Sequence, residues 1–196
     1  MTEQELVAAA RGGDQDAFAR LVETNQAKVY NLAHRMTGNP EDAADLTQEA
    51  FLNAWRGLAR FGGQSAFSTW LYRLTSNVCI DFLRRQSRCE TLSMTVEGPE
   101  NESRQAELPD ERWCPERELE RWEASRTLET GLAALSPDHR QVLLLRELEG
   151  LSYAEIAQCL SLEEGTVKSR IARARLSLRD YLKKAGNFSG LLPSKD

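Results

Sequence analysis

The sequence predicts an all-α protein with two small helical domains joined by a flexible acidic linker, the second a four-helix domain containing a helix-turn-helix. Three observations support this expectation. Apolar residues recur at helical spacing in almost every periodic segment, with no strand-like alternation and no internal repeat. Prolines, a glycine and many acidic residues collect between residues 91 and 125. A short capped segment, a turn and a basic helical segment follow one another near the C-terminus.

The first domain is expected to span residues 1–90 and to contain three long helices. One covers residues 16–36, where the apolar positions form a single amphipathic stripe. Asn39 then has the features of an N-cap with a proline directly after it, and the second helix runs to about Trp55. The third helix covers about residues 65–85 and again carries one apolar face.

The linker is expected to cover residues 91–127 and to become helical toward Glu116. The formal net charge of the chain is −5, which by itself argues against nucleic acid as a partner. The charge is segregated, however, because acidic residues dominate in residues 97–123 and basic residues dominate in residues 168–184. A local basic face of this kind can bind phosphates whatever the global sum.

The second domain is expected to span residues 128–185, followed by a tail over residues 186–196. Ser136 precedes a proline and has the features of an N-cap, so a helix with a run of apolar residues begins there. Ser152 and Glu155 have the spacing of a capping box, in which each side chain satisfies the other residue's backbone N–H. These signals predict a short helix ahead of the basic segment.

A turn over residues 161–165 and a last helix that opens at Thr166 complete the predicted helix-turn-helix. One face of this helix carries the positions expected to pack inward, Val167, Ile171, Ala174 and Leu178. The opposite face centres on Ser169, Ala172, Arg173 and Leu176, with Lys168 beside it and Arg170 and Arg175 at its edges. Small side chains let a helix approach the major groove closely, Arg173 can read guanine, and edge arginines can pair with phosphates. The alternative is a surface helix whose basic side is only solvated.

Composition argues against several other classes of protein. The chain has 41% hydrophobic and 28% charged residues, the balance of a soluble globular protein. Apolar runs stay short of the roughly 20 residues that cross a bilayer, and the N-terminus lacks signal-peptide features, so a cytoplasmic protein without membrane insertion is expected. We expect no metal, no cofactor and no enzyme activity, since neither paired metal-ligand spacings nor a nucleophile–base set is visible. The cysteines are Cys79, Cys89, Cys114 and Cys159.

Two segments of the first domain carry chemistry beyond their apolar faces. DLTQEAFLNAW, residues 45–55, has a core-facing apolar set and a polar face formed by Asp45, Gln48, Glu49 and Asn53. FSTWLYRLTSNVCIDFLRR, residues 67–85, interleaves aromatic residues with arginines, a pattern that can stack unpaired bases while cations hold the backbone. The alternatives are a solvated face for the first segment and a core aromatic cluster for the second, and for Trp70 and Phe82 we favour the core.

These two segments and LSYAEIAQCLSLEEGTVKSRIARAR, residues 151–175, resemble in the same order three signature regions of a known family. That family is the extracytoplasmic-function (ECF) type of bacterial RNA polymerase sigma factor, within the sigma-70 family. The likeness covers nearly the whole chain apart from the linker and the tail. Three ordered matches are far more specific than any one of them.

The resemblance implies a role for each region. The first is similar to the region that binds core RNA polymerase, and its contact candidates are Asp45, Gln48, Glu49, Asn53 and Trp55. The second is similar to the region that opens the minus-10 promoter element and captures a flipped base, and its candidates are Phe61, Phe67, Ser68, Asn77, Arg84 and Arg85. The third is similar to the module that reads the minus-35 element as duplex, and its candidates are Lys168, Ser169, Arg170, Ala172 and Arg173. Some relatives carry a larger residue where Ala172 stands, so the base preference stays open.

The resemblance further implies the function of the whole chain. It would bind core RNA polymerase, direct it to specific promoters and assist promoter melting in a stress or envelope response, restrained by an anti-sigma factor clasped between the domains. The linker would thread toward the polymerase active-site channel. A stand-alone helix-turn-helix transcription regulator is the main alternative, and a helical adaptor that binds only protein is the second. Stable association with core polymerase separates the first interpretation from both alternatives.

Overall fold

The computed structural model describes residues 1–63, 65–93 and 115–185, with the backbone alone described for residues 89–93 and 115–122. Within these ranges every element is helical and no strand occurs, which confirms the all-α prediction. The elements in chain order are α1 (Glu3–Arg11), α2 (Gln15–Thr37), α3 (Pro40–Gly57), the 3-10 turn η1 (Leu58–Arg60), α4 (Phe67–Ser93), α5 (Pro115–Ala133), α6 (Pro137–Glu147), α7 (Tyr153–Leu160) and α8 (Glu164–Lys184). The expected tail, most of the expected linker and Cys114 lie outside the described residues, as does the side chain of Cys89.

Local capping determines where the helices of the first domain begin and end. Before α2, the carboxylate of Asp14 accepts a hydrogen bond from the backbone N–H of Ala17 at 3.0 Å. α2 ends at Gly38, whose φ of 76° lies in the left-handed region that favours glycine. The side-chain oxygen of Asn39 then accepts from two N–H groups in the first turn of α3, at 2.8 and 3.2 Å. The predicted end of one helix and the predicted N-cap of the next are both confirmed.

Helix α1 lies ahead of the first expected helix and was not predicted. Thr2 and Glu5 form a reciprocal capping box, with the N–H of Thr2 donating to the Glu5 carboxylate at 2.8 Å and the Thr2 hydroxyl accepting from the N–H of Glu5 at 3.3 Å. Val7 and Ala10 are buried, and α1 packs against α2. The Thr-x-x-Glu spacing at the start of the chain is the sequence signal for this helix.

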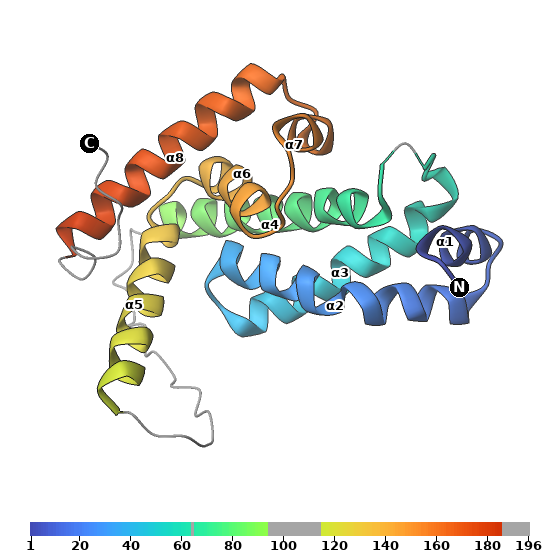
Figure 1. Ribbon diagram of the computed structural model, residues 1–196, viewed down its shortest axis with the longest axis horizontal. Helices are drawn as coiled ribbons and strands as arrows, with labels where there is room; N and C mark the ends of the chain where they lie inside the picture. Colours follow the sequence, from blue (N-terminus) through green and yellow to red (C-terminus); the bar gives the residue numbers. More distant parts are fainter. Residues whose placement is uncertain (64, 94–114, 186–196) are drawn as a thin grey trace.

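Helices α2, α3 and α4 pack together and form the core of the first domain (Figure 1). Leu21 and Met36 of α2 and Leu71 of α4 are almost completely buried. α3 contributes small buried side chains to this core, Ala43, Ala50 and Ala54. Small side chains at a contact shorten the distance between two helix axes, so α3 lies close to its neighbours. α4 continues to Ser93, beyond the end expected near residue 85.

Helices α5 to α8 form the second domain, in which α5, α6 and α7 each pack against α8. Val142 of α6, Ile156 of α7 and Ile171 of α8 are buried at its centre. The hydroxyl of Ser136 accepts from the N–H of His139 at 3.4 Å, which confirms the predicted N-cap. α5 begins at Pro115, inside the segment expected as linker and next to Glu116, where that segment was expected to become helical.

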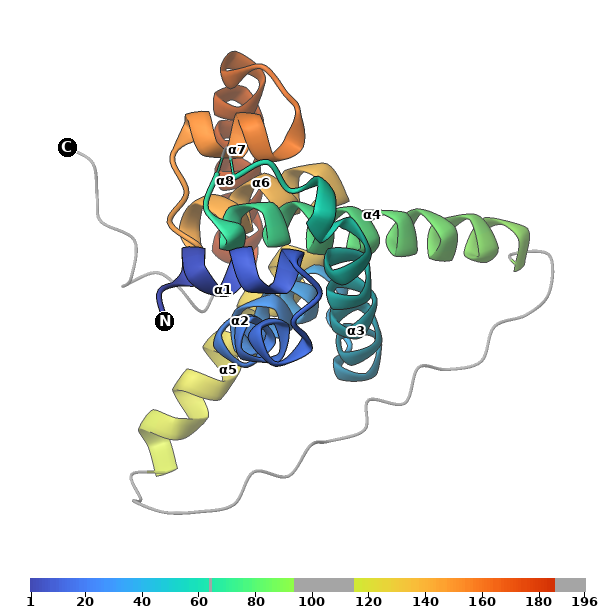
Figure 2. The same cartoon turned by 90° about the vertical axis from the view of Figure 1, so that its right-hand side faces the viewer.

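The two domains also pack against each other, because α2 and α4 contact helices of the second domain. Figure 2 shows α7 above α4 and α2 below it. Residues 142–145 of α6 are apolar and buried in succession, as expected for a helix with partners on several sides. Those partners are α8 on one side and α2 and α4 on the other. Burial raises the pKa of Tyr72 in α4, and a hydrogen bond between Tyr72 and Glu149 of the second domain raises it further.

Candidate nucleic-acid interface

The helix-turn-helix of the second domain consists of α7, a short turn and α8. The Ser152 hydroxyl accepts from the N–H of Glu155 at 3.2 Å, and the Glu155 carboxylate accepts from the N–H of Ser152 at 2.8 Å, as predicted. These hydrogen bonds hold the pKa of Glu155 below its ordinary value. α7 ends at Leu160, and its C-cap Ser161 adopts a left-handed φ of 54° that redirects the chain toward α8.

The start of α8 differs from the prediction. The helix begins at Glu164, with Glu163 as its N-cap, rather than at Thr166. The N–H of Val167 donates to the carbonyl of Glu163 at 3.1 Å, which is the first i to i−4 hydrogen bond of the helix. The last residues of the expected turn therefore already form the first turn of α8. Two carboxylates therefore lie at the positive end of the helix dipole, where they are favourable.

The two faces of α8 separate as the helical period predicts. Val167, Ile171 and Ala174 are buried against the rest of the domain. Four of the five reading candidates are exposed on the other side, namely Lys168, Ser169, Ala172 and Arg173. Arg170, the fifth, is half-buried and turned toward α6. The exposed face ends in Leu176, which is 49% exposed.

Most cations of α8 form ion pairs with carboxylates. Lys168 pairs with Glu164 at 2.6 Å, and Arg175 pairs with Glu147, its Nε 3.0 Å from the carboxylate. These two contacts raise the pKa of each cation. Arg173 has no such partner among the residues that the structure describes. Its guanidinium is therefore the most available group on the reading face.

The loop before α4 rests on an aromatic cluster. The ring centroids of Phe61 and Trp70 are 4.9 Å apart, and those of Phe67 and Trp70 are 5.8 Å apart. Phe61 is 7% and Phe67 is 2% exposed, so neither ring is free to stack on a base in this conformation. The buried rings of Phe61 and Phe67 thus support the loop, and the role of these two residues at the minus-10 element stays a prediction. Ser68 lies half-buried at the start of α4.

A pocket of about 250 Å³ opens beside this loop. Arg60 and Arg73 lie on its wall, and neither was singled out as a site residue from the sequence. The remaining lining residues include Ser65, Thr69 and Trp70 of the first domain, together with Gln158 and Cys159 of α7. The second domain thus covers one side of the loop pocket.

The other minus-10 candidates lie farther along α4. Asn77, Arg84 and Arg85 are all exposed. Arg85 Nε donates to the carbonyl of Asp81 at 3.2 Å, and Arg84 faces Asp138 of α6. Asn77 is ten residues beyond the start of α4, about 15 Å along the helix at 1.5 Å per residue. α4 therefore presents a polar ridge on which Arg73, Asn77 and Arg84 share one face, and this ridge meets the loop pocket at Arg73.

The polymerase candidates gather on α3. Asp45, Gln48 and Glu49 are exposed, whereas Asn53 and Trp55 are half-buried. Burial raises the pKa of Asp42, which lies beside this face, and the negative charges of Asp45 and Glu41 raise it further.

An apolar groove adjoins this acidic face and was not predicted. Its volume is about 380 Å³ and its lining residues include Phe18, Val22, Phe51, Leu52 and Trp55. The ring centroids of Phe18 and Trp55 are 4.9 Å apart, and Leu52 is 54% exposed. The sequence signal for this groove is Leu52. It is an apolar residue that the helical period places between Gln48 and Glu49 on the otherwise polar face of α3.

In the described part of the chain, no group of three or more His, Cys, Asp or Glu side chains is placed to hold a metal ion. Cys79 and Cys159 are buried free thiols, and burial raises the pKa of each to about 12. Among the described helices, none is both long and apolar enough to cross a bilayer.

Comparison with known proteins places both domains in one family. Residues 21–89 match the family model for Sigma-70 region 2, and residues 125–178 match that for Sigma-70, region 4. The ECF RNA polymerase sigma factor SigW of Bacillus subtilis is 37% identical over 171 residues, which is 87% of this chain and 91% of SigW. The ECF RNA polymerase sigma-E factor of Escherichia coli K12 is 38% identical over 179 residues, 89% of this chain and 91% of the relative.

Two solved structures share the fold. CnrH in complex with the cytosolic domain of CnrY has a TM-score of 0.67 and 26% identity, over 93% of this chain and 97% of CnrH. RpoE of Bartonella quintana, in complex with the anti-sigma factor NepR, has a TM-score of 0.64 and 23% identity, over 85% of this chain and 96% of RpoE. The identity and coverage of the relatives, together with the two matched regions, show that this chain belongs to the family of ECF RNA polymerase sigma factors.

Proposed function

We propose that this chain binds core RNA polymerase, directs it to specific promoters and helps to open them. It carries out no bond chemistry of its own and acts in the cytoplasm. One observation carries this proposal: the three signature segments lie on three separate exposed surfaces, on α3, α4 and α8. A factor that must hold a large enzyme, a melted strand and a duplex at once needs surfaces of this kind.

α8 is the proposed reader of the minus-35 element. Its exposed centre carries the small side chains of Ser169 and Ala172, which allow close approach to a groove. Arg173 projects from that centre and is suited to a bidentate contact with guanine. Lys168 and Arg170 lie beside it and would contact phosphates, which contribute affinity and salt dependence rather than sequence preference.

α4 and its preceding loop are the proposed binder of the melted minus-10 element. The exposed ridge with Asn77 and Arg84, together with the neighbouring Arg85, offers one amide and two cations to a single strand. The loop pocket, with Arg60 and Arg73 on its wall, offers a hollow next to that ridge for an extruded base. Extrusion costs a few kcal/mol of stacking and pairing, so a pocket that holds the base stabilises the open state.

α3 is the proposed contact with core polymerase. Its acidic face around Asp45, Gln48 and Glu49 provides charge, and the adjoining groove with Leu52 and Trp55 provides apolar area. An apolar centre with a polar rim is the usual anatomy of a protein interface.

We further propose that an anti-sigma factor restrains this chain and that the system serves a stress or envelope response. The support is indirect. RpoE of Bartonella quintana occurs in complex with the anti-sigma factor NepR, and CnrH occurs in complex with the cytosolic domain of CnrY. Both share the fold of this chain.

Run-off transcription tests the proposal. The purified full chain is added to core RNA polymerase on a library of promoters, and specific transcripts are expected only when both are present. Glu49→Lys should abolish them by reversing charge on α3, whereas Glu23→Lys, an equal change on an exposed part of α2, should not.

The alternatives give different outcomes. Promoter binding of equal strength without polymerase would indicate a stand-alone transcription regulator. Association with protein but no dependence on DNA would indicate a helical adaptor. A chain that fails to join core enzyme, or joins it without initiating, contradicts the proposal.

A further inference from the structure

We propose that Asp138 acts as an internal substitute for a DNA phosphate: it pairs with one DNA-binding arginine from each domain and holds the free chain in a closed, self-masked state. The inference rests on the proposed roles of Arg84 and Arg170 in promoter binding. It goes beyond them by assigning a role to a carboxylate that belongs to neither DNA-binding surface.

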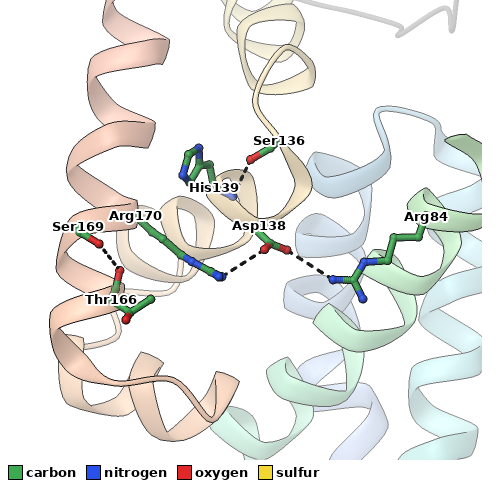
Figure 3. Close-up of polar contacts among 7 residues, drawn as sticks. All are labelled: Arg84, Ser136, Asp138, His139, Thr166, Ser169 and Arg170. Carbon is green, nitrogen blue, oxygen red and sulfur yellow. Dashed lines mark hydrogen bonds and ion pairs between the residues drawn. The ribbon is translucent and has the colours of Figure 1, made fainter.

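The geometry joins three helices at one side chain (Figure 3). Asp138 Oδ2 lies 3.4 Å from Nη1 of Arg170 in α8, and Asp138 Oδ1 lies 3.9 Å from Nη2 of Arg84 in α4. Each carboxylate oxygen therefore faces a different guanidinium, and the two guanidiniums come from different domains. In the part of the chain that the structure describes, no other ion pair joins the two domains.

The position of Asp138 is determined locally. Ser136 caps α6 and Pro137 is its first residue, so Asp138 stands in the first turn, where the helix dipole favours a negative charge. A guanidinium recognises carboxylates and phosphates through the same planar array of donors. The carboxylate therefore occupies donors that a phosphate of the promoter would otherwise engage.

Closure also covers the loop pocket of the first domain. Cys159 Sγ of α7 donates to the carbonyl oxygen of Thr69 at 3.6 Å, and Gln158 and Cys159 form one wall of that pocket. A strand bound to the loop would therefore meet α7. The ion pair between Arg84 and Asp138 and the covered pocket act in the same direction, because both keep the first domain from binding a melted strand.

The ion pair between Arg84 and Asp138 is weak enough for the two domains to separate. The side chains of Arg84 and Asp138 are 60% and 43% exposed, so the pair is screened by solvent and weak. One carboxylate also leaves one of the two positive charges uncompensated, and this excess still attracts DNA. Phosphates that arrive with the promoter can then replace Asp138 at both arginines.

The test compares two neutralising variants of the full-length chain. Asp138→Asn removes the carboxylate between the domains. Glu147→Gln is the matched control, because Glu147 pairs with Arg175 of α8 and both belong to the second domain. The readout is the alkylation rate of Cys159 by iodoacetamide relative to that of Cys79, measured by peptide mass spectrometry. Both thiols are buried, and among the described residues only the thiol of Cys159 hydrogen-bonds to the other domain.

Asp138→Asn should raise the Cys159-to-Cys79 ratio about two- to fivefold, the range that an exposed ion pair allows. Glu147→Gln should leave the ratio unchanged. Global unfolding exposes both thiols and so does not imitate this result. Arg84→Gln tests the same contact from the first domain without altering α6, and should raise the ratio as well.

A ratio that stays at the wild-type value in both Asp138→Asn and Arg84→Gln overturns the proposal. So does an equal rise in Glu147→Gln, which would indicate a general effect of lost negative charge. In wild type, a short DNA duplex of arbitrary sequence should raise the ratio in the same way. Failure of transcription with core polymerase would count against the proposed function alone, since alkylation requires neither polymerase nor a promoter.

Discussion

Arg140 of the second domain donates a hydrogen bond from Nη1 to the backbone carbonyl oxygen of Met36, near the C-terminal end of α2 in the first domain. The same guanidinium donates from Nη2 to the carbonyls of Ala133 and Leu135, at 2.6 and 3.4 Å. One cation thereby satisfies carbonyls at the ends of α2 and α5, where the helix dipoles favour positive charge. Arg140 is only 6% exposed, and its burial lowers the pKa of the guanidinium.

Arg140→Lys should lower the free energy of unfolding by about 1–3 kcal/mol, because an ammonium cannot reach these separated acceptors and buried carbonyls lose their donors. Urea denaturation followed by circular dichroism measures the change. Arg146→Lys is the control, since Arg146 donates at 2.7 Å to one carbonyl, that of Leu151 in its own domain. Equal losses in the two variants would show that the contact with the first domain adds nothing.

Local signals in the sequence were sufficient to predict most helix boundaries. Asn39, Ser136 and the pair Ser152–Glu155 act within three residues of themselves, so their caps can be read without knowing the fold. α1 has an equally local capping box at Thr2, but its apolar stripe is too short for periodicity to indicate a helix. The start of α8 was placed too late because a glycine in the first turn of a helix resembles a turn.

Features that depend on packing between distant segments could not be predicted in this way. Burial of Phe61 and Phe67 follows from their contact with Trp70 beneath the loop, whereas the sequence pattern fits an exposed stacking surface equally well. The contact of Asp138 with Arg84 joins helices from different domains, and no periodicity marks it. The apolar groove beside α3 likewise needs both α2 and α3 in place.

Leu52→Ala should weaken binding of the chain to core RNA polymerase by about 1–3 kcal/mol, the value of burying one leucine side chain at an interface. Leu52 is 54% exposed in the free chain, so its loss leaves the core of the first domain intact. Fluorescence anisotropy of a labelled chain titrated with core enzyme gives the dissociation constant. Leu148→Ala removes an exposed leucine from the second domain and should have no effect; a similar loss there would refute a specific role for the groove.

Arg173→Ala should weaken binding to the minus-35 element by about 1–3 kcal/mol and relax the base preference at one position. The reason is the availability of this guanidinium at the centre of the reading face. Competition between duplexes that differ at single base pairs, in the presence of core enzyme, measures both effects. Arg179→Ala provides a comparison, since Arg179 pairs with Asp180 at 3.1 Å farther along α8. Equal weakening on every duplex would make Arg173 a phosphate contact instead.

Asn77→Ala should leave binding to the minus-35 duplex unchanged and impair strand opening. Asn77 lies on the exposed ridge of α4, in a different domain from α8, so the two activities are separable. The lost amide would no longer hold a base whose extrusion costs a few kcal/mol, and the open complex would be less populated. Permanganate reactivity of thymines in the melted region measures opening directly. Asn31→Ala is a matched control on an exposed position of α2, and unchanged reactivity in Asn77→Ala would exclude this residue from base capture.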